Sequence, residues 1–101
     1  MYNYFRSKKG DIVVMKKLEY FDENELVLLK VKRLLKQGVN GYSFKKWIND
    51  IEIESIDDDK IVLIVHSEEQ KEVIGKIFND LLFYTFEYVT KKERKIEAIL
   101  K

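Results

Sequence analysis

Apolar residues recur with a 3.6-residue period between Asp22 and Gln37, which predicts an amphipathic helix over that range. Asp22 and Glu25 mark its beginning, because their spacing is that of a capping box. Gly38 suits the left-handed position just past a helix end, and the charge of Lys36 complements the helix dipole there. The apolar positions are Val27, Leu28, Val31, Leu34 and Leu35.

A shorter second helix is expected to follow a turn and to begin at Ser43, whose side chain can cap it. Phe44, Trp47 and Ile48 stand at i, i+3 and i+4 in this segment and therefore point to one side. We expect these three side chains to belong to the core.

Alternating isoleucines and a β-branched run predict a hairpin of two strands, near residues 51–56 and 61–65. Between them, Asp57, Asp58, Asp59 and Lys60 are interpreted as turn residues. An acidic metal site is the alternative, but the spacing of the aspartates does not match a calcium-binding loop.

A long third helix is predicted from Ser67 to about Val89, because Ser67 and Gln70 repeat the capping-box spacing ahead of an apolar stripe. Residues 90–94 then form a basic turn, and residues 96–100 a closing strand. The element order is α-α-β-β-α-β, and the expected fold is α+β, a three-stranded sheet packed against helices. This domain covers residues 22–101.

The first 21 residues are interpreted as a partly ordered N-terminal extension. Within it, Asp11–Met15 either forms an additional strand or belongs to an arm without one.

Length and composition indicate one domain, since 101 residues with an apolar fraction of 46% suffice for a single core. The absence of cysteine excludes disulfides and thiolate metal sites. The first residues contain no apolar run long enough for a signal peptide or a membrane span. We therefore expect a cytoplasmic protein.

The net charge of +1 conceals an asymmetry between the two halves of the chain. Residues 1–49 carry 11 Lys/Arg against 5 Asp/Glu, whereas residues 50–101 carry 8 against 13. A basic half can attract phosphate backbones or acidic protein surfaces. The alternative is an ordinary solvated, lysine-rich surface.

No arrangement of residues indicates catalysis. His66 is the one histidine, and it is interpreted as structural because a zinc site needs three or four ligands. The sequence shows no glycine-rich phosphate loop, no Ser/His/Asp arrangement in a recognisable context and no isolated carboxylate pair in an apolar setting. We expect neither an enzyme nor a bound cofactor or metal.

Gly38-Val39-Asn40-Gly41 is a Gly-x-x-Gly turn between two predicted helices, the pattern with which KH domains clamp a nucleic-acid backbone. Helix capping by Gly38 is the competing and favoured explanation.

Three stretches together resemble the amino-terminal domain of the bacterial replication initiator DnaA. They are Ser43-Phe44-Lys45-Lys46-Trp47-Ile48 after a helix, then Asp59-Lys60 with the run Ile61–Val65, then a capped helix and a final strand in Lys95–Leu100. The resemblance covers about Glu25–Leu100 and implies a KH-like fold. It also implies a protein-interaction module that self-associates, contacts the replicative helicase or its loader, receives regulators and in some members weakly binds single-stranded DNA.

Family contacts cluster on the second helix and at the start of the third. In this chain the resemblance assigns them to Ser43, Lys45, Lys46, Ser67, Glu69 and Gln70. One departure stands out, because Glu69 occupies the position where the family commonly exposes a phenylalanine, and an apolar anchor is what usually makes a binding hot spot. The family's ATPase and DNA-binding modules have no counterpart in this sequence, so we expect a truncated or freestanding copy.

The alternative function is a small KH-like domain that binds single-stranded nucleic acid. Its candidate residues are Lys30, Arg33, Lys36, Gly38, Gly41, Lys45 and Lys46. A third possibility is a homodimer with no other partner.

Overall fold

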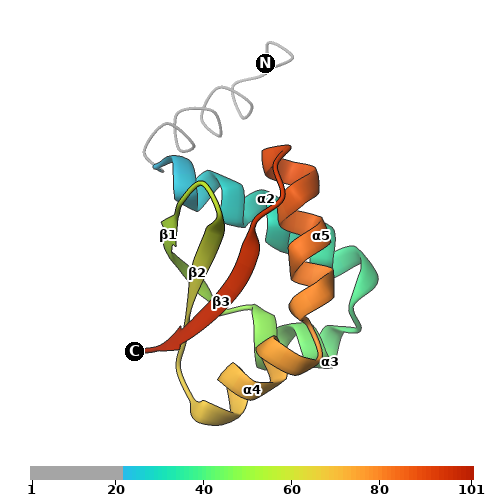
Figure 1. Cartoon of the computed structure of the whole chain (residues 1–101). Helices are drawn as coiled ribbons and strands as arrows, with labels where there is room; N and C mark the ends of the chain where they lie inside the picture. Colours follow the sequence, from blue (N-terminus) through green and yellow to red (C-terminus); the bar gives the residue numbers. More distant parts are fainter. Residues whose placement is uncertain (1–21) are drawn as a thin grey trace.

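A computed structural model describes residues 22–101, in which a three-stranded sheet packs against helices (Figure 1). The α+β class predicted from the sequence is confirmed. The expected strand at Asp11–Met15 lies outside the described residues. Within them, no helix is both long enough and apolar enough to cross a membrane.

The first described helix, α2 (Glu23–Gly38), begins as predicted. The Asp22 carboxylate accepts from the Glu25 N–H at 2.7 Å, and the Glu25 carboxylate accepts from the Asp22 N–H at 3.0 Å. Its end differs from the prediction, because Gly38 is still helical and does not have a positive φ. Val39 follows in an extended conformation (φ −106°), which carries the chain directly to the next helix without a left-handed residue.

The second helical segment starts earlier than predicted. Asn40 caps α3 (Gly41–Ser43), and its side chain accepts from the Ser43 N–H at 2.9 Å. Ser43 makes no side-chain cap, because it lies inside the helical segment. The segment continues as a π-helical turn, η1 (Phe44–Ile48), in which the Asn49 N–H donates to the Phe44 carbonyl five residues back.

The predicted hairpin is confirmed as β1 (Glu52–Ile56) and β2 (Lys60–Val65), which pair antiparallel. The aspartates form its turn, where the Asp57 N–H donates to the Lys60 carbonyl at 2.8 Å. The closing strand β3 (Lys95–Leu100) pairs parallel to β2, so that β2 is central in the order β1-β2-β3.

The long third helix predicted from Ser67 to Val89 is instead two helices, α4 (Glu68–Lys76) and α5 (Asn79–Thr90). The break at Ile77–Phe78 contains neither proline nor glycine. Phe78 leaves the helical region (φ −102°, ψ 1°), and its N–H donates to the Val73 carbonyl. The change of direction allows both helices to bury apolar side chains, Ile74 from α4 and Leu82 and Phe86 from α5.

The left-handed conformation predicted for Gly38 at the end of α2 is found instead at the end of α5. Lys91 ends α5 with φ 64°, and its N–H donates to the Glu87 carbonyl at 2.7 Å. Helices commonly end with a residue in this conformation, and here a lysine occupies it in place of the usual glycine.

The core lies between the sheet and the helices. Alternate residues of β2 face it, and Ile61, Leu63 and Val65 are all fully buried. From the second helix, Phe44 and Ile48 are buried as predicted, whereas Trp47 is only half-buried and packs at the margin of the core. The full core cluster is Val31, Leu35, Phe44, Ile48, Ile51, Ile61, Leu63, Val65, Ile74, Leu82 and Phe86.

Two aromatic residues of α5 test this arrangement. Phe86 is 1% exposed and Tyr88 is 66% exposed. Phe86→Ala removes buried apolar surface and leaves a cavity, so it should lower the free energy of unfolding by about 3–5 kcal/mol. Tyr88→Ala is the matched control and should change it by less than about 1 kcal/mol. Urea unfolding measures both, and similar losses for the two variants would contradict the assigned core.

Candidate functional site

The two stretches to which the resemblance assigns partner contacts come together in the structure. Residues 43–46 belong to α3 and η1, residues 67–70 begin α4, and these elements gather at one end of the sheet (Figure 1). At the opposite end lie the hairpin turn, the start of α2 and the end of α5. The candidate surface is therefore formed by η1 and the first turn of α4.

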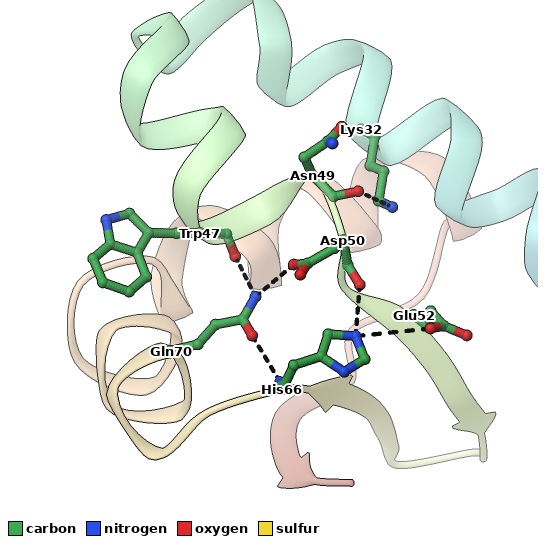
Figure 2. Close-up of polar contacts among 7 residues, drawn as sticks. All are labelled: Lys32, Trp47, Asn49, Asp50, Glu52, His66 and Gln70. Atoms are coloured by element: carbon green, nitrogen blue, oxygen red, sulfur yellow. Dashed lines mark hydrogen bonds and ion pairs between the residues drawn. The ribbon is translucent and has the colours of Figure 1, made fainter.

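Gln70 connects these two elements (Figure 2). Its side-chain amide is buried and forms three hydrogen bonds within the fold. Nε2 donates to the Trp47 carbonyl at 2.9 Å and to the Asp50 carboxylate at 2.8 Å, and Oε1 accepts from the His66 N–H at 2.7 Å. The end of η1, the approach to β1 and the end of β2 are thus held by one side chain.

Of the capping box predicted for Ser67 and Gln70, the structure confirms the bond made by the Ser67 side chain. Its hydroxyl accepts from the Gln70 N–H at 3.0 Å and so caps α4. The Gln70 side chain does not return this bond to Ser67 but accepts from the preceding residue, His66. The Gln70 side chain is buried and makes its hydrogen bonds within the domain, whereas Ser67 and Glu69 are exposed.

His66 lies directly after β2, and its ring contacts the segment that leads into β1. Its ring Nε2 lies 3.1 Å from the Asp50 carbonyl oxygen and 3.8 Å from a carboxylate oxygen of Glu52 on β1 (Figure 2). These contacts hold the end of β2 to the start of β1. Within residues 22–101, no group of three or more His, Asp or Glu side chains is arranged to hold a metal ion.

Lys32 of α2 contacts the backbone at the end of η1. Its ammonium donates to the Asn49 carbonyl at 2.7 Å (Figure 2). Burial lowers the pKa of Lys32 from its ordinary value of 10.5, and this effect exceeds the opposing influence of the Asp50 and Glu52 carboxylates. Asn49 directly follows η1, where helix carbonyls have no partner within the helix, and the Lys32 ammonium supplies one.

A cluster of Tyr42, Lys46 and Trp47 forms the outer part of the η1 surface. The Lys46 ammonium lies 5.6 Å from the centroid of the Tyr42 ring and 4.9 Å from that of the Trp47 ring, and it donates to the Tyr42 hydroxyl at 3.4 Å. Tyr42 is 73% exposed, and the indole of Trp47 points away from the Gln70 amide (Figure 2). Lys46 was predicted as a contact residue and Tyr42 was not, although their i, i+4 spacing places the two side chains on one side of a helix.

The residues of the alternative nucleic-acid site are only partly brought together. Lys36 from the last turn of α2 lies 5.9 Å from the Phe44 ring and so adjoins η1, where Lys45 and Lys46 are exposed. Lys30 and Arg33 are exposed farther back along α2. Gly38 and Gly41 are exposed, and an added Cβ would meet no atom within 4 Å at either position.

No protein-family model and no curated protein matches this chain. The resemblance to the DnaA amino-terminal domain therefore stays a prediction that depends on its motif residues.

Gln70→Glu tests the amide network. A carboxylate has no N–H, so the variant loses both donated bonds and places a negative charge beside Asp50. We expect the free energy of unfolding to fall by about 3 kcal/mol at neutral pH. Burial and the Asp50 charge raise the folded-state pKa of the new carboxyl. The loss should therefore grow as the pH rises above the unfolded value of about 4.3 and shrink below it.

Urea unfolding at pH 4 and pH 7 measures this difference. Glu69→Gln, one residue away and exposed, is the matched control and should stay within about 0.5 kcal/mol of the parent chain at both pH values. A Gln70→Glu variant as stable as the parent at pH 7 would show that the network does not support the fold.

Proposed function

We propose that this chain is a non-catalytic, cytoplasmic protein-interaction domain with a KH-like fold, which acts in the initiation of bacterial DNA replication or in its control. The motif residues Phe44, Trp47 and Ile48 and the element order support this proposal. DnaA itself, the replicative helicase and DnaA-associated regulators are the partners that the resemblance implies.

One observation carries the proposal: Gln70 joins the two stretches at which family contacts cluster. Its hydrogen bond to the Trp47 carbonyl fixes η1 against the first turn of α4 without using the outward side chains of either element. A surface held in this way loses little conformational freedom on binding, which favours affinity.

The exposed charges of this surface differ in sign between its two elements. Lys45 and Lys46 lie on η1, and Glu68 and Glu69 lie on α4. Such charges orient a partner and raise its association rate more than they raise affinity. Glu69 in place of an apolar anchor therefore favours a weak, salt-sensitive contact, in which the half-buried Trp47 and exposed Tyr42 supply the apolar part.

Binding to DnaA, the replicative helicase and DnaA regulators can be measured by NMR titration of the labelled full chain. We expect amide shifts centred on residues 42–47 and 67–71. Lys46→Glu and Glu69→Lys should each weaken the association about tenfold, because each replaces a favourable rim charge by a repulsive one. Glu93→Lys is the control, since Glu93 is exposed in the turn before β3, at the other end of the sheet. Absence of binding to all these partners at high micromolar concentration would overturn the proposal.

The Tyr42, Lys46 and Trp47 cluster favours a second candidate function, binding of single-stranded nucleic acid. Aromatic rings accept stacked bases, and lysines beside them contact phosphates. Lys36, beside the Phe44 ring, and Lys45 of η1 are exposed and add further positive charge.

Titration with a labelled oligonucleotide at low and moderate salt tests this second function. Binding should weaken steeply with salt, because phosphate contacts release counterions. Tyr42→Ala should weaken it through lost stacking, and Gly41→Asp through repulsion between the new carboxylate and the phosphates. Both variants should fold, because Tyr42 is 73% exposed and a Cβ at Gly41 would meet no atom within 4 Å. Binding that does not depend on salt, or none at all, would eliminate this candidate.

A further inference from the structure

A groove of about 440 Å³ lies between α2 and β1, the strand at one edge of the sheet (Figure 1). Its apolar lining consists of Leu28, Leu29, Ile51 and Ile53. Leu29 is 42% exposed. Residues 51–54 line the groove one after another, although successive side chains of a strand point to opposite faces, so the groove follows the edge of β1. Within residues 22–101 this strand pairs only with β2, which leaves the backbone groups of its outer edge for an extended segment.

Carboxylates surround the apolar lining. Among the described residues, those that line the groove are Asp22, Glu25, Glu52 and Glu54, against the single cation Lys32. The Lys101 ammonium lies 2.9 Å from the Glu54 carboxylate, and the His66 ring lies 3.8 Å from that of Glu52. With Lys101 counted and His66 neutral, four negative charges face two positive ones. An apolar segment with basic residues therefore fits this groove, whereas the phosphates of a nucleic acid would be repelled.

The chain itself contains a segment of this composition. Residues 1–21 carry five Lys/Arg against two Asp/Glu, and Asp11–Met15 includes three consecutive β-branched residues, followed directly by two lysines. The segment joins the described domain at Asp22, which itself lines the groove. The six residues between Met15 and Asp22 span up to about 20 Å, and a strand of the length of β1 measures about 17 Å. Asp11–Met15 can therefore reach the whole groove.

We propose that Asp11–Met15 binds in this groove as an extended segment along the free edge of β1. One set of its alternate side chains then covers Leu29, and Lys16 and Lys17 lie close to the carboxylates. A segment of the same chain meets its groove at an effective concentration on the order of millimolar, so the contact does not require high intrinsic affinity. This contact lies within one chain and is independent of the partner and nucleic-acid surfaces proposed above.

Paramagnetic NMR tests the contact in the full chain. The sequence has no cysteine, so Gly10→Cys supplies one site for a nitroxide label beside the segment. The amide signals of residues 51–54 should then lose most of their intensity. Leu29→Glu should restore them, because it places a carboxylate on the apolar lining. Leu34→Glu is the matched control, since this leucine of α2 is 36% exposed but does not line the groove, and the loss should persist. Unbroadened signals, or equal effects of the two variants, would overturn the proposal.

Substitutions within the first 21 residues separate the apolar segment from overall charge. Val13→Asp combined with Val14→Asp should abolish the broadening of the groove amides, because one of these two side chains faces the apolar lining in either orientation of the segment. Tyr2→Asp combined with Tyr4→Asp adds the same charge outside the segment and should keep most of the broadening. Equal losses from the two pairs would show that charge alone holds residues 1–21 near the groove, which contradicts the proposed contact.

A mixture of two samples shows whether the segment binds its own chain. One sample carries the nitroxide and no isotope, and the other carries the isotope and no nitroxide. We expect the groove amides of the mixture to keep their intensity. Broadening as strong as in the singly labelled chain would mean that the segment binds a second copy, and it would overturn the intramolecular contact whatever the outcome of the tests with other proteins.

Discussion

A single buried amide, that of Gln70, connects the end of η1, the approach to β1 and the junction between β2 and α4. Removing such a group from water is unfavourable unless each of its polar atoms finds a partner. Here the three partners come from η1, from the segment before β1 and from the segment after β2. The network is therefore satisfied only when these elements adopt one relative position. The candidate surface on η1 and α4 inherits its geometry from this requirement.

The central strand imposes a second constraint. Because β3 pairs parallel to β2, the chain must cross from one end of the sheet to the other between them, and α4 and α5 make this crossing. The break at Ile77–Phe78 lets both helices bury their apolar sides on the way. It also turns Leu81, Tyr84 and Tyr88 outward, so the route that completes the core leaves an apolar face on the surface.

Two surfaces of different character result. The η1 surface mixes lysines with aromatic rings and adjoins acidic residues of α4, so it suits partners recognised through charge and stacking. The α5 face exposes Leu81, Tyr84 and Tyr88.

The sequence by itself determined the elements whose signals are local. Both caps at Asp22 and Ser67, the hairpin and the closing strand followed from spacings within a few residues, and Phe44 and Ile48 were correctly assigned to the core. The tertiary structure decided what depends on distant partners: the helix break, the parallel pairing of β3, and the burial of Gln70, whose hydrogen bonds span up to 23 residues. Local patterns specify backbone conformation. The direction of a buried polar side chain depends instead on which donors and acceptors, remote in the sequence, the fold places within hydrogen-bond distance.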